Sequence, residues 1–241
     1  MESAVAPEPP RDSESALGRL AGVFVSPAKT FAEIALRPTW LLPVAIWAGL
    51  ALPLSELILS KTDWRAFMTK QLARGERKLT DAQMEAAIEQ SRSLGWLWDI
   101  AAVLAPFLVT LVVAGVLWAA CRAFGWDVKF KQSLGVTGHA FLPATLGSIA
   151  LLVVLWNRDT VDPELVGDAL WTNPSFLADR QTNPVLHGLL AALDMFSFWT
   201  MGLLVLGLAA AARAPRGRVA LLVVSLWGLF VLGKAGVTAL F

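Results

Sequence analysis

Four long stretches of this sequence, and a shorter one before them, are apolar and almost free of charged side chains. In chain order, the five stretches cover residues 41–59, 99–121, 133–156, 185–212 and 219–241. Each is close to the ~20 residues that an α-helix needs to cross a hydrocarbon core about 30 Å thick. A helix in water needs a polar outer face, and a segment such as LVTLVVAGVLWAAC has none. The pattern therefore predicts an all-α, polytopic membrane protein with five transmembrane helices.

The chain before the first span is more polar. Residues 1–19 are rich in Pro, Ser and Ala, lack the pattern of a signal peptide, and are expected to form a disordered tail. Within residues 20–37, Ser26 followed by Pro27 predicts a helix start, and the apolar positions after it share one face. Two interpretations of this amphipathic helix are open: it lies at the membrane surface, or it packs as a cap on the bundle. Residues 20–241 would then form one membrane domain.

The segment between the first two spans, residues 61–95, is too polar to cross a membrane. Its apolar residues follow helical spacing in two runs. Thr80 and Gln83 have the spacing of a capping box, in which two side chains bond the free backbone N–H groups of a helix start. We therefore expect an interfacial helical hairpin that packs on the membrane domain.

Lys and Arg residues in short connections indicate the cytoplasmic side of a membrane protein. Two short connections, around residues 122–131 and 213–218, are basic, whereas the longer connection 157–184 is rich in acidic residues. This charge pattern predicts a cytoplasmic N-terminus and a C-terminus outside. The basic residues of the hairpin at 61–95 oppose that orientation, because they would also lie outside.

Composition excludes several classes of function. Apolar residues make up 56% of the 241 positions and charged residues 16%, and the mean hydropathy is +0.59. A formal net charge of +1 argues against nucleic-acid binding. One Cys and two His residues cannot build a conventional zinc site alone, and the common hydrolase and nucleotide-binding motifs are missing. We therefore predict no catalytic residues, no metal and no cofactor.

Four titratable side chains fall inside the predicted spans: Glu56, His139, Asp194 and Lys234. An ionised group costs about 2.5–3.5 kcal/mol at bilayer depth on insertion scales, so each needs a partner or a function. Helix rise places Glu56, Asp194 and Lys234 in the outer half of the membrane. We expect an Asp194–Lys234 ion pair, with Glu56 as a candidate third member. The pair either fixes helix register or belongs to a proton, ion or substrate relay.

His139 is expected nearer the cytoplasmic side, and Pro143 follows it by one helical turn. Two interpretations of this histidine are open. It is either a pH-sensitive switch or a buried neutral side chain bonded to a carbonyl that Pro143 frees.

Four segments of the chain resemble the Yip1 family of five-span membrane proteins in its bacterial form. They are GVFVSPAKTFAEIALRPTWLLP, LTDAQMEAAIEQ, HAFLP and LLAALDMFSFWTMGLLVLGLA, of which the first and last are the most specific. The resemblance covers most of Leu20 to Phe241. It implies five crossings, a cytoplasmic N-terminus, an outside C-terminus and no established catalytic residues. A Rab-GTPase partnership is not implied, because the long soluble N-terminal domain of many eukaryotic members is missing from this sequence.

Two hypotheses of function follow. In the first, the chain is a non-enzymatic Yip1-type protein of the bacterial cytoplasmic membrane that organises the membrane or partner proteins. Its partners would be the lipid bilayer and membrane proteins or further copies of the chain. In the second, it is a small transporter or channel that uses Glu56, Asp194, Lys234 and His139. A transporter needs a hydrated path through these residues, whereas a scaffold does not.

Overall fold

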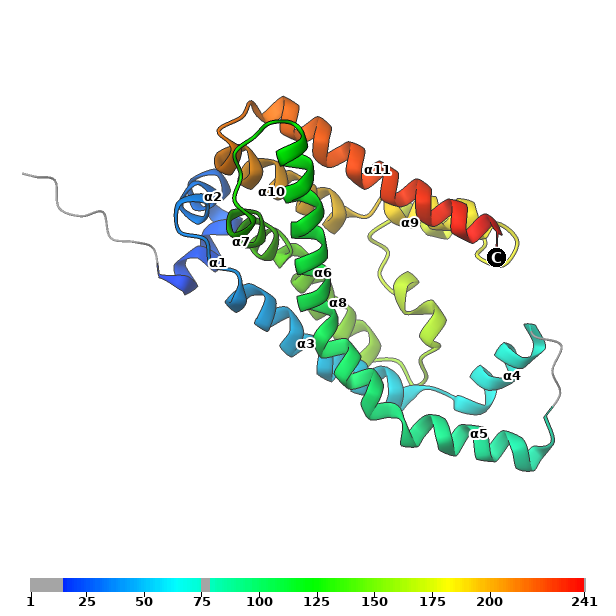
Figure 1. The fold of residues 1–241 in the computed structure, drawn as a ribbon. Coiled ribbons are helices and arrows are strands. Elements are labelled where there is room, and N and C mark those ends of the chain that lie inside the picture. Colours follow the sequence, from blue (N-terminus) through cyan, green and yellow to red (C-terminus); the bar gives the residue numbers. More distant parts are fainter. Residues whose placement is uncertain (1–14, 75–78, 241) are drawn as a thin grey trace, which may run out of the picture.

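The computed structural model describes residues 15–74 and 79–240. Within these residues the regular elements are helices, and five helical segments are long and apolar enough to cross a membrane. These segments are α3 (Leu41–Lys61), α6 (Gly95–Ala123), α7 (Phe130–Ala140) with α8 (Leu142–Trp156), α10 (Met195–Ala212) and α11 (Arg216–Leu240). The predicted all-α polytopic fold is therefore confirmed (Figure 1). Residues 1–14 of the tail predicted over residues 1–19 lie outside the described residues, whereas Ser15 caps and residues 16–19 begin a helix instead of belonging to a disordered tail.

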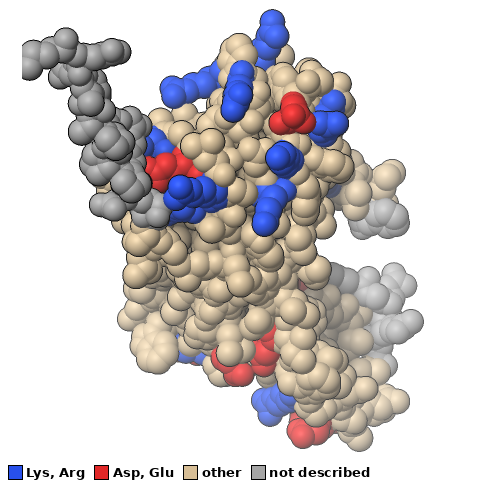
Figure 2. Space-filling model, turned by 60° about the vertical axis from the view of Figure 1, so that its left-hand side comes forward, with Lys and Arg blue, Asp and Glu red and all other residues tan. Residues whose placement is uncertain are grey.

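An uncharged band lies between two charged ends of the molecule. Figure 2 shows Lys, Arg, Asp and Glu at the top and bottom of the visible face, with other residues between them. Large apolar side chains point outward from the spans: Val112 of α6 is 64% exposed, and Leu221 and Phe230 of α11 are each 70% exposed. Lipid tails solvate such a surface, whereas water would not. The chain is an integral membrane protein.

The third span consists of two helices that meet at Phe141. Pro143 stands in the first turn of α8 and has no backbone N–H, so the helical hydrogen-bond ladder cannot continue unbroken from α7. The ladder resumes at Thr145, whose N–H donates to the Phe141 carbonyl at 3.3 Å. The bent segment Phe130–Trp156 still has the length of a membrane span.

The fourth apolar stretch differs from the single helix that the sequence predicts over residues 185–212. A short helix, α9 (Pro184–Ala192), ends there, and α10 begins afresh at Met195. Asp194 causes this break, because its Oδ1 accepts hydrogen bonds from the N–H groups of Phe196 at 2.8 Å and Ser197 at 3.3 Å. An acidic cap also lies favourably at the positive end of the helix dipole. Asp194 therefore stands at the end of a span rather than inside it.

Two short helices precede the first span: α1 (Ala16–Val25) and α2 (Pro27–Leu36). Phe31 and Ile34 of α2 are fully buried, and α2 packs against α7 and α10. Leu17 and Val25 of α1, in contrast, are 70% and 81% exposed. The segment therefore packs on the bundle, as one of the two interpretations expects, and its exposed apolar side chains leave the membrane-surface interpretation as a prediction.

The close contact of α2 with the spans depends on Gly207 of α10. A Cβ at this position would lie 2.7 Å from Cδ1 of Phe31 and would also overlap the side chain of Val136 in α7. Gly138 of α7 is similarly close to the first span, because its Cβ would lie 3.2 Å from the carbonyl oxygen of Trp40. Small residues allow helices in membranes to approach this closely. We call this region, with the exposed cations Arg122, Lys131, Arg213, Arg216 and Arg218 around it, the basic end.

Four short helices besides α9 form the opposite end, which we call the loop end: α4 (Trp64–Arg74), α5 (Asp81–Ser93) and the 3₁₀ helices η1 (Pro163–Asp168) and η2 (Pro174–Leu177). The capping box predicted for Thr80 and Gln83 is present at the start of α5, with both of its hydrogen bonds. The connection between α8 and α9, residues 157–183, is called the long loop. Lys70 of α4 connects the hairpin to this loop, since its Nζ lies 2.9 Å from Asp162 and 2.7 Å from Glu164.

Lys61, the last residue of α3, binds the end of α8. Its Nζ donates to the carbonyls of Leu155 at 3.3 Å, Trp156 at 2.6 Å and Arg158 at 2.6 Å. The last carbonyls of a helix have no partner within it, and a cation there complements the helix dipole. The first and third spans therefore end together.

Candidate functional site

His139 lies in the interior of α7 and is 1% exposed. Its Nδ1 is 2.9 Å from the carbonyl oxygen of Gly135, one turn earlier in the same helix. This carbonyl is not one that Pro143 frees, because the missing N–H of Pro143 leaves the carbonyl of His139 itself without its helical partner. The ring is held by a bond within its own helix.

Glu56 is exposed on α3 and lines a cavity of about 540 Å³ at the loop end. Arg92 and Asp99 line the same cavity. Asp99 Oδ1 is buried and, among the described residues, has no hydrogen-bond partner. The ion pairs within the described part of the chain do not include Glu56, so it is not joined to Asp194 or Lys234.

Asp194 connects the start of α10 to the long loop. In addition to its two cap bonds, its Oδ2 accepts a hydrogen bond from the hydroxyl of Thr172. The Thr172 carbonyl in turn accepts from the N–H of Met195 at 3.1 Å. Within residues 15–74 and 79–240, no cation lies within ion-pair distance of the Asp194 carboxylate.

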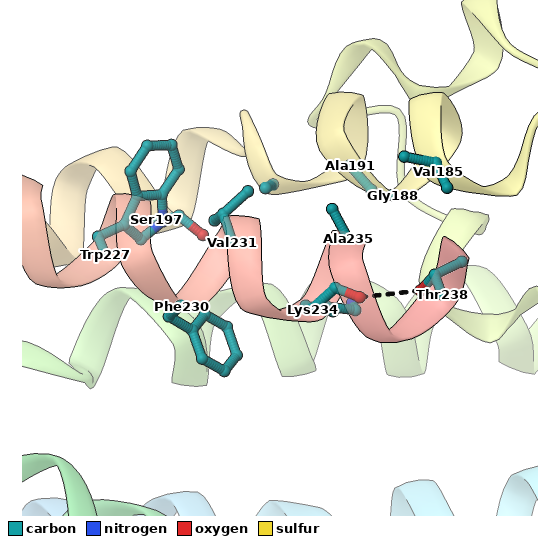
Figure 3. A pocket seen from close by; sticks show the side chains of 11 residues that line it. Val185, Gly188, Ala191, Ser197, Trp227, Phe230, Val231, Lys234, Ala235 and Thr238 are labelled. Carbon is teal, nitrogen blue, oxygen red and sulfur yellow. Dashed lines mark hydrogen bonds between the residues drawn. The ribbon is translucent and has the colours of Figure 1, made fainter. Parts of the chain in front are cut away.

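Lys234 is exposed on α11 and lines a small cavity of about 140 Å³ between α9 and α11. Figure 3 shows Lys234 and Phe230 one turn apart on α11, with Val231 and Ala235 on the side toward α9. The hydrogen bond drawn there runs from the Thr238 hydroxyl to the Lys234 carbonyl at 3.1 Å. The expected Asp194–Lys234 ion pair is not formed among the described residues, because the carboxylate caps α10 instead.

A larger cavity of about 700 Å³, which we call the central cavity, is lined by residues of all five spans and of the long loop. Its walls are mainly apolar residues of α6, α8, α10 and α11, together with Trp47 of α3. Its polar contributors include Thr172, Asn173 and Asp194 at the loop end. The cavity therefore joins a long apolar wall to a group of polar side chains that holds one carboxylate.

The central cavity opens toward the surrounding membrane. Val112 of α6 and Phe230 of α11 both line it, and they are 64% and 70% exposed. In Figure 1, α6 and α11 run in different directions toward the loop end. The small cavity beside Lys234 is adjacent, because Ser197, Trp227 and Phe230 line both. Asp194 and Lys234 thus belong to neighbouring cavities with a shared wall.

Several other charged groups at the loop end have hydrogen-bond or ion-pair partners. Hydrogen bonds to Glu164 and Asp162 raise the pKa of Lys70 above its ordinary value. N–H and hydroxyl donors of Thr182 and the N–H of Gln181 lower the pKa of Asp179. Asp194 resembles Asp179, since neutral donors bind its carboxylate, and neither Asp194 nor Lys234 has an opposite charge beside it in the described residues.

Sequence reasoning finds Asp194 and Lys234 but misses the central cavity. The cavity depends on the separation of α6 from α11, which no local pattern reports. Ala144, Gly147 and Ser148 place small side chains on one face of α8, and all three line the cavity. Their spacing alone does not predict a cavity, because small residues also allow close packing, and a Cβ on Gly147 would lie 3.2 Å from Cδ2 of Phe196.

Comparisons with known proteins identify the family. The search of curated proteins and the search of solved structures each found no match. The model of the Yip1 domain matches residues 21–236 of this chain. Because this match covers nearly the whole sequence, and because the fold has the five spans that the resemblance implies, the protein belongs to the Yip1 family.

Proposed function

We propose that this protein is a non-enzymatic organiser of the bacterial cytoplasmic membrane. It acts on the bilayer and on membrane proteins or further copies of itself, through helix packing and the helices before its first span. The Yip1 family is known for non-catalytic membrane proteins, which supports this assignment. The basic end lies in the cytoplasm and the end of α11 lies outside, as the positive charge of the short connections indicates.

The observation that carries this proposal is the structure of α1 and α2. The pair is held against the spans by the buried Phe31, yet Leu17, Val25 and Leu36 are 70%, 81% and 78% exposed. Exposed cations belong to the same end of the molecule, and each Lys or Arg near an anionic leaflet contributes about 1 kcal/mol of attraction. A rigidly attached amphipathic segment of this kind can enter one leaflet and displace its headgroups.

The positions of the four titratable groups favour this role over transport. His139 lies at the interior of α7, Glu56 lines the cavity beside α3, and Asp194 and Lys234 line two other cavities. A relay needs such groups along one hydrated route. Their separation, together with the apolar wall of the central cavity, argues for an organiser.

Reconstitution of the full chain into vesicles with and without phosphatidylglycerol tests this function. We expect the chain to reduce vesicle diameter in the anionic membrane, as seen by electron cryo-microscopy, without any saturable flux of protons or monovalent ions. The triple variant Leu17→Ser, Val25→Ser, Leu36→Ser should lose the effect on diameter.

The matched control replaces three exposed apolar residues of the loop end: Leu165→Ser, Phe176→Ser, Leu177→Ser. This variant should remodel vesicles as the unaltered chain does. A saturable flux that Asp194→Asn abolishes would overturn the proposal in favour of a transporter.

A further inference from the structure

Two opposite charges at neighbouring cavities have no counter-charge of their own. Asp194 lines the central cavity and Lys234 lines the small cavity beside it, and neither takes part in an ion pair within the described residues. A single charge next to hydrocarbon is costly unless a group of opposite sign neutralises it. A ligand that carries both a cation and an anion would satisfy both side chains.

The rest of the central cavity fits a hydrocarbon chain. Its walls are apolar over α6, α8, α10 and α11, and its volume of about 700 Å³ lies within the range of small-molecule sites. The opening between Val112 and Phe230 faces the membrane, so a chain can enter from the bilayer without crossing water. The polar residues Thr172 and Asn173 stand at the loop end, where a headgroup belongs.

We infer that the central cavity binds one phospholipid whose headgroup carries a primary amine. One acyl chain lies along the apolar wall, the ammonium group donates hydrogen bonds to Asp194, and the phosphate lies at Lys234. Ser197, Trp227 and Phe230 line both cavities and connect these two contacts.

The carboxylate favours a primary amine over other headgroups. Asp194 accepts bonds from two backbone N–H groups and from the Thr172 hydroxyl, and a carboxylate has about four acceptor positions. An ammonium group can donate to the remaining position, in a charge-assisted bond about twice as strong as a neutral one. A quaternary ammonium has no N–H to donate, and a glycerol headgroup has no positive charge. This site goes beyond the organising role and does not depend on it.

Native mass spectrometry of the full chain tests the site directly. Delipidated protein in detergent is mixed with equal amounts of phosphatidylethanolamine, phosphatidylcholine and phosphatidylglycerol of identical acyl chains. We expect the unaltered chain to retain phosphatidylethanolamine in preference. Asp194→Asn keeps a good helix cap but removes the charge, and should reduce that preference about tenfold.

Two further variants separate the headgroup from the chain. Lys234→Met should reduce retention of all three lipids, because all carry a phosphate; its side chain is exposed, so folding is preserved. Val112→Trp should also reduce all three, because the larger side chain closes the opening. Asp179→Asn is the matched control for Asp194→Asn, because the Asp179 carboxylate also caps a turn but does not line the cavity. Leu108→Trp is the matched control for Val112→Trp, because Leu108 is a 60% exposed position of α6 outside the cavity.

The outcomes decide the inference. Loss of the preference in Asp194→Asn, with both controls unchanged and with unaltered melting temperatures, supports it. An unchanged preference for phosphatidylethanolamine in Asp194→Asn overturns it. If Leu108→Trp loses as much lipid as Val112→Trp, the retained lipid lies only on the outer surface, and this result also overturns the inference. Dimer formation that Val112→Trp disrupts, without lipid retention by the unaltered chain, would assign the cavity to a second copy instead.

Discussion

At the basic end, α2, α7 and α10 meet so closely that a glycine is needed between them, whereas toward the loop end α11 stands apart from α6 across the central cavity. The change is visible along α11 itself. Val219 and Val223 near its start are buried, but Leu232 and Val237 further along are 65% and 59% exposed. The basic end is held mainly by closely packed side chains, whereas the loop end combines a smaller buried apolar cluster around Leu155 with hydrogen bonds and ion pairs beside the central cavity.

The difference shows how one membrane domain can combine a closely packed region with a cavity that can hold a ligand. Dispersion contacts and close backbone approach stabilise helices in a membrane, where the hydrophobic effect contributes little between them. The loop end instead uses polar contacts such as those of Lys70 with Asp162 and Glu164. Such contacts fix the ends of segments without filling the volume between them.

The largest expected effect on stability is the loss of a packed aromatic ring at the basic end. Phe31→Ala should lower the free energy of unfolding by about 3–5 kcal/mol, because it removes a fully buried side chain and leaves a cavity. Phe176→Ala, at a 66% exposed ring of the loop end, should change it by less than about 1 kcal/mol. Unfolding in mixed micelles, followed by Trp fluorescence, measures both. Equal losses of unfolding free energy in the two variants would contradict the difference in packing between the two ends.

Replacement of a glycine by alanine should affect stability differently at two positions of α10. Gly207→Ala should destabilise the fold by about 1–3 kcal/mol, because its Cβ meets Phe31 and Val136. Gly202→Ala, where no atom lies within 4 Å of the added Cβ, should leave stability unchanged or raise it. The same unfolding measurement compares them. If Gly207→Ala were neutral, the basic end would be looser than its geometry indicates.

A smaller effect is expected at the loop end, and it depends on pH. Because the pKa of Lys70 is raised in the folded chain, its contribution to stability is fully present below the ordinary value of 10.5 and is lost as pH rises through the folded value. The midpoint of thermal unfolding should therefore fall in this alkaline window. Lys70→Met should remove the contribution at neutral pH, and Lys70→Arg should shift the loss to higher pH. Identical alkaline profiles for all three proteins would contradict the expectation.

Local chemistry made parts of this fold predictable. The spans follow from apolar length, the start of α2 from Pro27 after Ser26, and the start of α5 from the capping box of Thr80. Even here the cap at Ser26 makes no side-chain hydrogen bond, because the position is fixed by the proline.

Two features of the site were not predictable in the same way. Asp194 in an apolar run resembles an embedded charge, although its carboxylate caps a helix; the preference of Asp for the position before a helix was the available signal. The central cavity depends on how far α11 leans from α6, which is decided by contacts among distant segments. Lys234 lies on the predicted fifth span, but its expected ion pair with Asp194 is not found among the described residues, since that pairing also depends on contacts between distant segments.

The contacts of Lys61 constrain how the molecule can move. One ammonium group ties the end of α3 to the carbonyls that end α8, so these two helices cannot slide past each other without breaking three bonds at once. α8 forms one wall of the central cavity, and we expect the hydrogen bonds of Lys61 to restrain its movement. We therefore expect any widening of the entrance to need displacement of α11 together with α9, against which α11 packs.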